Sequence, residues 1–207
     1  MTTQDKNSSY EYDRKIRISI EDVIHMPSPG MVLPNQIQFN PDGTLISYLY
    51  SESGNLNQNL YIYNPETGGQ TLLATPPDGG TQEGSLSPEE ELQRERSRQR
   101  TLGITQYTWS KIGNHILIPI QGNIYIIDQP GDPMRKLVDA GGKPTLDPQF
   151  SPDGQWVSYV QDAEVYIIPV EGGEPRQLTH GARGTGKMNG LAEFIAQEEM
   201  GRRHGYW

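Results

Sequence analysis

Two adjacent glutamates near the end of the chain are the residues best placed to do chemistry. Residues 191–200 are typical of a helix whose apolar stripe ends with Phe194 and Ile195. Glu198 follows Phe194 by four positions. Glu199 follows Ile195 by the same spacing, so both carboxylates continue the stripe. If the apolar residues of this stripe pack on the protein, the carboxylates that continue it would lie at the rim of a cavity. There the pair would suit a cation such as a protonated amine. The alternative is a frayed, solvated helix end.

A second candidate is a run of arginines within residues 87–100. Ser87 is a good N-cap, Pro88 suits the first helical position, and Glu90 completes a capping box. Leu92 is nearly the only apolar residue, so packing cannot hold this helix firmly. We expect either a solvated surface helix or a mobile arginine arm that meets an anionic or carbonyl group.

Other sequence patterns argue against catalysis by this chain itself. Residues 181–188 nearly match the phosphate-binding loop G-x-x-x-x-G-K-[ST], but Met188 stands where the magnesium-binding hydroxyl belongs. We therefore expect these glycines to form only a flexible lead into the helix. No G-x-S-x-G elbow occurs, and the four histidines lack metal-ligand spacing. We expect no catalytic residue, no metal and no cofactor in this chain.

The elements that must position these residues follow from a repeat that occurs three times, beginning at Phe39, Trp109 and Phe150. Each copy has an aromatic residue, a turn ending in Gly, a β-rich run, a second turn and a second β-rich run. In the Pro-Asp-Gly turns, Pro presets φ, Asp bonds its own backbone and Gly supplies a positive φ. The pattern predicts about four short antiparallel strands per unit, as in a β-propeller blade. The alternative is a sandwich of unrelated hairpins.

The spacing of the copies predicts where the blades are interrupted. Phe39 and Trp109 are 70 residues apart, whereas Trp109 and Phe150 are 41 apart, which is about a bare blade. The long interval must hold an insertion, and a second one precedes the next aromatic start, expected at Trp207. The expected segments are an N-terminal segment (1–30), a first blade (31–75), a helical insertion (76–104), a second blade (105–140), a third blade (141–180) and a double-glutamate helical insertion (181–204).

Composition bounds the class of protein. The 207 residues include 23 Gly, 16 Pro and no Cys, which suits turn-rich all-β structure without disulfides. The net charge of −9 disfavours nucleic-acid binding. No signal peptide or membrane span is seen, so we expect a cytoplasmic protein. Closed propellers have about 4–8 blades. We therefore interpret the chain as an incomplete N-terminal β-propeller: an all-β partial propeller of about three to four blades with two helical insertions.

Three segments resemble the N-terminal β-propeller of the dipeptidyl peptidase IV family, within the prolyl oligopeptidase clan. Residues 189–199, followed by 205–207, are similar to the double-glutamate motif of that family and the blade start after it. Residues 87–104 resemble the arginine-containing segment of its cytosolic branch. Residues 19–24 are like the entry into its first blade. The double-glutamate segment is the specific one, because many propellers share the blade repeats.

The resemblance implies an activity for the whole protein and roles for three residues. Members of this family join an eight-bladed propeller to an α/β-hydrolase domain, whose Ser, Asp and His remove N-terminal dipeptides with Pro or Ala in second place. By resemblance, Glu198 and Glu199 bind the α-amino group of the substrate. Arg98 contacts the region of the substrate backbone carbonyl, with Arg96 and Arg100 as alternatives. The implied partners are a peptide N-terminus, the hydrolase domain of the same protein and a second copy in a homodimer, with no nucleic acid and no membrane.

The sequence departs from the family pattern just after the glutamates. Gly201 stands where the family usually has a bulky or acidic residue, which would weaken the helix. Arg202 and Arg203 are unusually basic there and would partly neutralise the acidic pair. The alternative hypothesis is a non-catalytic β-propeller module that binds protein partners, with no hydrolase domain and no need for the two glutamates.

Overall fold

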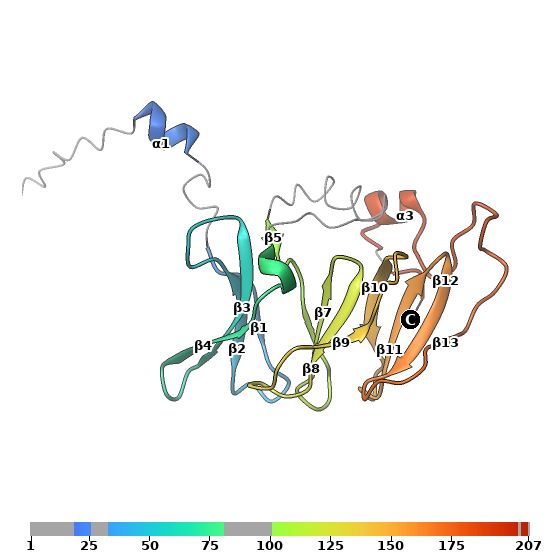
Figure 1. Ribbon diagram of the computed structural model, residues 1–207, viewed down its shortest axis with the longest axis horizontal. Coiled ribbons are helices and arrows are strands. Elements are labelled where there is room, and N and C mark those ends of the chain that lie inside the picture. The colour runs from blue at the N-terminus through green and yellow to red at the C-terminus, as the bar shows by residue number, and fades with distance from the viewer. Residues whose placement is uncertain (1–18, 26–32, 81–100, 203, 207) are drawn as a thin grey trace, which may run out of the picture.

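The computed structural model describes residues 19–25, 33–80, 101–202 and 204–206. Its strands form three separate sheets that lie side by side in chain order (Figure 1). The prediction of an all-β partial propeller is confirmed. Within the described residues, no helix is both long and apolar enough to cross a membrane.

Each sheet contains an antiparallel meander of four consecutive strands, and β5 adds a fifth strand to the first sheet. In blade one the strands are β1 (Asn35–Phe39), β2 (Ile46–Tyr50), β3 (Asn57–Asn64) and β4 (Gly69–Ala74). In blade two they are β6 (Thr108–Trp109), β7 (Ile116–Ile120), β8 (Asn123–Ile127) and β9 (Arg135–Val138). In blade three they are β10 (Thr145–Phe150), β11 (Trp156–Gln161), β12 (Glu164–Pro169) and β13 (Arg176–Gln177). Outside the blades lie α1 (Ile20–Ile24), the 3₁₀ helix η1 (Pro77–Gly80), β5 (Leu102–Gly103) and α3 (Phe194–Glu199).

The predicted turn after each aromatic residue is present in all three blades. The backbone N–H groups of Asn40, Ser110 and Ser151 donate to the carbonyl five residues later, at 3.1, 2.9 and 2.8 Å. The side-chain oxygen of each of these residues also accepts from the N–H five residues later. Gly43 and Gly154 have φ of +73° and +71°, which favours glycine. The first polar residue of the turn thus stabilises it with both its backbone N–H and its side-chain oxygen. The Pro-Asp-Gly pattern predicted such a bond for Asp alone.

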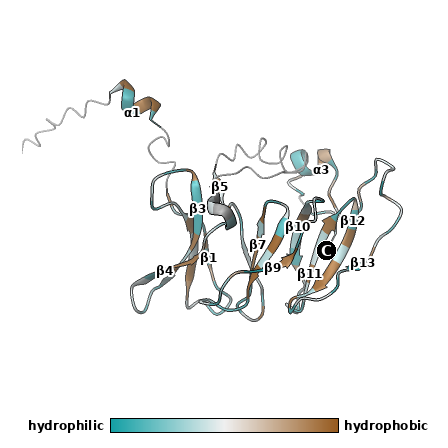
Figure 2. Ribbon diagram, in the orientation of Figure 1, coloured by the Kyte–Doolittle hydropathy of each residue, from teal (hydrophilic) through white to brown (hydrophobic). Residues whose placement is uncertain are grey.

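Apolar side chains fill the space between successive sheets. One cluster, including Leu60, Ile62 and Ile116, lies between blades one and two. The other, including Ile126 and Val157, lies between blades two and three. Figure 2 shows that hydrophobic segments recur along the strands of the three sheets. Each sheet is thus stabilised by its neighbour, as blades of a propeller are.

Polar side chains tie blade one to blade two inside this core. The Ser47 hydroxyl is fully buried and accepts from the Trp109 indole N–H at 2.7 Å. The Tyr107 hydroxyl lies 2.8 Å from the same oxygen and donates to the Gln36 carbonyl at 2.6 Å. Burial raises the pKa of Tyr107 to about 12, so the phenol stays protonated at neutral pH.

One strand was not expected from the sequence. At the end of the first predicted insertion, β5 pairs in parallel with the start of β3, so that Gly103 lies opposite Gln58. A Cβ on Gly103 would lie 2.5 Å from the Gln58 carbonyl oxygen, and its φ is +79°. The backbones approach this closely because Gly103 has no side chain. The predicted helix at 87–100 lies outside the described residues.

The buried Ser47 hydroxyl predicts a specific stability effect. Ser47→Ala should lower the free energy of unfolding by about 1–3 kcal/mol, because the buried Trp109 N–H loses its acceptor. Trp109→Phe removes that donor, so the double variant should be destabilised by less than the sum of the two single changes. Urea unfolding of the three variants measures this coupling. If the destabilisation of the double variant equals the sum of the two single effects, the hydrogen bond between Ser47 and Trp109 does not contribute to stability.

Candidate substrate-binding site

The two glutamates lie at the end of a short helix. α3 begins at Phe194 and not at the predicted Leu191, because the Glu193 side chain caps it by accepting from the Ala196 N–H at 3.2 Å. Leu191 instead forms a β-bridge with His204. Glu198 and Glu199 occupy the last turn of α3, and both are exposed.

The predicted apolar stripe faces the opposite way from our expectation. Ala192 and Ala196 are buried, at 7% and 5% exposure, whereas Phe194 and Ile195 are 55% and 59% exposed. The expectation that the stripe packs on the protein is therefore wrong. Ala196 is thus the buried residue of the helix, and the larger apolar residues remain exposed beside the acids. In the described part of the chain, α3 thus presents an exposed surface that is both apolar and acidic.

A buried carboxylate fixes the approach to α3. Glu164, at the start of β12, is 1% exposed and accepts from the Thr179 hydroxyl at 2.7 Å and from the Asn189 side chain at 2.9 Å. It also accepts from the backbone N–H groups of Ala182 and Arg183, at 2.7 and 3.4 Å. These bonds, led by that from Thr179, lower the pKa of Glu164 to about 2. Glu164 is therefore charged at neutral pH.

This arrangement argues against a phosphate-binding role for residues 181–188. Two of the backbone N–H groups of the loop already bind a carboxylate of the protein itself. The loop is also more than the flexible lead that we expected, because Glu164 draws together residues 15 to 25 positions away. Sequence reasoning missed Glu164. The sequence feature that could have identified it is an acidic residue at the start of an otherwise apolar strand.

Close backbone packing joins the start of α3 to its return segment. The Gly205 N–H donates to the Gly190 carbonyl at 3.1 Å. A Cβ on Gly205 would lie 2.4 Å from the Gly190 carbonyl carbon, and one on Gly190 would lie 2.5 Å from Val165. Both positions therefore need glycine. The two segments lie against blade three as a compact loop.

The chain after the glutamates turns back at Gly201. Its φ of +63° ends the helix in the left-handed region, as glycine commonly does. The Arg202 N–H donates to the Ala196 carbonyl at 2.9 Å, and its guanidinium donates to the His204 carbonyl at 3.1 Å. Gly201 thus forms the helix end rather than merely weakening it. Arg203 lies outside the described residues.

A second carboxylate holds the return segment. Asp147 Oδ1 lies 2.7 Å from His204 Nδ1, and the Tyr206 hydroxyl donates to the Asp147 carbonyl at 3.0 Å. Burial raises the pKa of the Asp147 carboxyl, while the neighbouring His204 acts against that rise. Burial also raises the pKa of Tyr206 to about 12. Neither Asp147 nor His204 was singled out from the sequence.

A matching contact, called the joint below, occurs between blades one and two: a tyrosine hydroxyl donates to the backbone carbonyl of a residue in the first strand of a blade. Gln36 and Asp147 both have positive φ, +49° and +50°, three residues before the aromatic end of the strand. The carbonyl of each accepts from a tyrosine of the next segment, Tyr107 or Tyr206. Tyr206 is therefore the counterpart of Tyr107. Trp207, the expected start of the next blade, lies outside the described residues.

This repeat places the two predicted insertions at equivalent points. Each lies between the last strand of a blade and the tyrosine of the next joint. Figure 1 shows η1 and β5, which lie at the two ends of the first insertion, at the same end of the sheets as α3. Arg96, Arg98 and Arg100 lie outside the described residues, so the structure does not place them relative to the glutamates.

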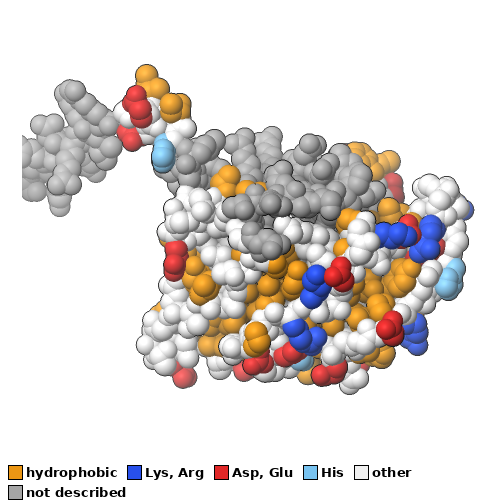
Figure 3. All heavy atoms as spheres, in the orientation of Figure 1, with side chains coloured by type: hydrophobic (Ala, Val, Ile, Leu, Met, Phe, Trp, Pro, Cys, Tyr) orange, Lys and Arg blue, Asp and Glu red, His pale blue; other side chains and the backbone are white. Residues whose placement is uncertain are grey.

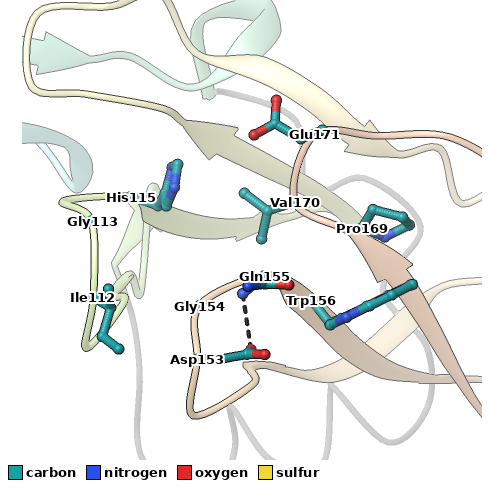
Figure 4. Close-up of a pocket in the computed structure, with 10 residues that line it drawn as sticks. All are labelled: Ile112, Gly113, His115, Asp153, Gly154, Gln155, Trp156, Pro169, Val170 and Glu171. Atoms are coloured by element: carbon teal, nitrogen blue, oxygen red, sulfur yellow. Dashed lines mark hydrogen bonds between the residues drawn. The ribbon is translucent and has the colours of Figure 1, made fainter.

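The structure also has an open cavity of about 420 Å³ far from α3 (Figure 4). Its lining includes Ile112 and His115 of blade two, and Trp156 and Val170 of blade three. These residues lie at the ends of the strands opposite to Asp147 and Glu164. None of the predicted site residues lines it. In the described segments, no group of three or more acidic, histidine or cysteine side chains could hold a metal ion.

Comparisons with known proteins point to one group of peptidases. Residues 121–207 match the family model described as the dipeptidyl peptidase IV (DPP IV) N-terminal region. Dipeptidyl peptidase 8 of Homo sapiens and that of Mus musculus are each 30% identical over 139 residues, covering 60% of this chain. The chain spans only 16% of the length of these relatives. The crystal structure of Porphyromonas gingivalis dipeptidyl peptidase 4 matches 84% of this chain and 24% of its own, with a TM-score of 0.53 and 20% identity.

The lowered pKa of Glu164 predicts how stability depends on pH. Because the pKa falls from 4.5 to about 2 on folding, the carboxylate stabilises the fold above pH 4.5 and loses this effect as pH falls towards 2. Glu164→Gln should lower the Tm at pH 7 by roughly 5 °C. The difference from wild type should shrink by pH 3. Thermal unfolding at both pH values measures it, with the exposed Glu174→Gln as the control. An equal difference in Tm between wild type and Glu164→Gln at pH 7 and pH 3 would contradict this role of the charged carboxylate.

Proposed function

We propose that this chain, whose residues 121–207 match the family model for the dipeptidyl peptidase IV N-terminal region, is the substrate-recognition part of the β-propeller of a serine-type dipeptidyl peptidase. The intact enzyme removes N-terminal Xaa-Pro or Xaa-Ala dipeptides from peptides. The observation that carries this proposal is the exposed pair Glu198 and Glu199 on a short helix whose flanking segments are hydrogen-bonded to blade three.

The chemistry of the pair suits a free peptide N-terminus. An ammonium group has three N–H donors and no acceptor, and two carboxylates can accept from it with charge-assisted hydrogen bonds. An internal peptide segment has no such group, so this contact selects chain ends and makes the enzyme an exopeptidase. Phe194 and Ile195, which are exposed one turn before the glutamates, offer apolar contact to the first side chain of the substrate.

An arginine from the first insertion completes the proposed recognition. Arg98 contacts the backbone carbonyl region of the bound dipeptide, with Arg96 and Arg100 as alternatives. Two findings support this role: both insertions occupy equivalent points of their blades, and the described ends of the first, η1 and β5, lie at the same end of the sheets as α3. A guanidinium group is a suitable donor to carbonyl oxygens because its N–H groups form a rigid fork.

The proposed partners follow from the resemblance to the dipeptidyl peptidase IV family. A C-terminal α/β-hydrolase domain of the same protein supplies the Ser, Asp and His of catalysis, and the intact enzyme acts as a homodimer in the cytoplasm without a cofactor. The net charge of −9 favours cationic groups over nucleic acid as ligands. The alternative is a non-catalytic interaction module. A fluorophosphonate probe separates the two, because only the peptidase has an activated serine to label in the intact protein.

Removing either charge should impair substrate recognition. Glu198→Gln or Glu199→Gln in the intact protein should lower kcat/KM for a glycyl-prolyl anilide by about 10- to 100-fold, because a charge-assisted bond to the ammonium is weakened. The exposed Glu174→Gln is a matched control that should leave kcat/KM unchanged. Full activity in both glutamate variants would refute the amine-binding role.

The arginine that contacts substrate can be identified in the same assay. We expect Arg98→Ala to lower kcat/KM by roughly tenfold, and Arg96→Ala and Arg100→Ala to have smaller effects, because one guanidinium is aimed at the substrate. If Arg96→Ala or Arg100→Ala has the largest effect instead, the assignment moves to that residue. If none of the three matters, the first insertion takes no part in recognition.

A further inference from the structure

Asp147 has a backbone conformation that non-glycine residues rarely adopt. Its φ of +50° lies at a β-bulge, where the register between β10 and β11 shifts between Leu146 and Gln149. Bulges commonly re-aim a side chain out of the regular ladder. The Asp147 side chain is 15% exposed and contacts His204 through Oδ1, while Gln149 donates to Oδ2 at 3.0 Å.

His204 connects this carboxylate to the start of α3. Its imidazole contacts Asp147, and its backbone bridges to Leu191, three residues before α3 begins. Its carbonyl accepts from the Arg202 guanidinium, just after the helix ends. The residues on both sides of α3 are thus joined to Asp147 through His204. Since a six-residue helix is not stable alone, its position depends on such contacts.

The equivalent joint of blade one shows that a carboxylate is not needed for packing. There Gln36 has the bulge position and donates to the Thr105 backbone carbonyl at 2.5 Å, a neutral bond to the main chain. In blade three the bond instead joins a half-buried carboxylate to a side chain of the segment that carries the glutamates. This difference lies where the second insertion meets the blade.

We propose that Asp147 is a positioning residue for substrate recognition: acting through His204, it fixes the place of α3 and therefore of Glu198 and Glu199. The inference rests on the proposed function. Asp147 touches no substrate. It sets the geometry of the amine site, where a displacement of about 1 Å can cost on the order of 100-fold in rate.

The test compares three variants of the intact protein. Asp147→Gly removes the side chain but accepts the positive φ, so it avoids the backbone strain of alanine. It should raise KM for a glycyl-prolyl anilide by about 10- to 100-fold, with a smaller change in kcat. Asp147→Asn should restore most of the wild-type KM, because its amide oxygen still accepts from the imidazole. Adding His204→Ala to Asp147→Gly should cause little further loss, because the two residues act as one unit.

Lys143→Ala is the matched control. It breaks the exposed ion pair with Asp162 at the same end of blade three, 2.8 Å in length, and should leave KM unchanged. A KM in Asp147→Gly within twofold of wild type overturns the proposal. So does an equal rise in Lys143→Ala, which would indicate a general loss of structure.

Hydrogen exchange separates this proposal from the proposed function. In Asp147→Gly, the backbone amides of residues 191–206 should exchange faster, and those of β7 and β8 should not change. If the wild-type protein has no dipeptidyl peptidase activity, the proposed function fails, but faster exchange at 191–206 still supports the positioning of α3. Unchanged exchange there overturns the positioning role whatever the activity.

Discussion

Sheet-on-sheet packing is the constraint on which the rest of this structure depends. Ile116 lies in the core between blades one and two, and Val157 in the core between blades two and three. Because the faces between sheets are filled, the polar groups that can meet a ligand must come from the ends of the strands. The segment that carries the glutamates emerges at such an end, after the last strand of blade three (Figure 1). Figure 3 shows hydrophobic side chains gathered over the sheets, with charged side chains around them.

Four carboxylates of the last blade and its insertion differ in burial, and this difference gives them different roles. Glu164 and Asp147 are largely buried and hydrogen-bonded, and they hold the two sides of the loop that contains α3. Glu198 and Glu199 are exposed on the helix between them. Burial of the first two requires fixed donors around them, whereas the second two lie at the surface of the helix. A short helix with a weak apolar contact can therefore present its acids in a defined place.

Much of the fold, but less of the site, could be predicted from the sequence. The turns at Asn40, Ser110 and Ser151 were predicted because their hydrogen bonds span only five residues. Helical spacing also predicted which residues share a side of α3. It could not show which side meets the protein, and the small Ala196 packs inward while Phe194 remains exposed. The predicted roles of Glu198, Glu199 and Arg98 remain predictions.

The sequence by itself determined the blades, their order and the two places where an insertion interrupts them, because turns and strands depend on neighbours a few residues away. Only the tertiary structure decided what holds the second insertion in place. Glu164 finds its partners up to 25 residues later, and Asp147 finds His204 after 57. Neither spacing follows a secondary-structure period. Such contacts arise when the sheets stack and a bulge turns a side chain towards a distant segment, which no local pattern specifies.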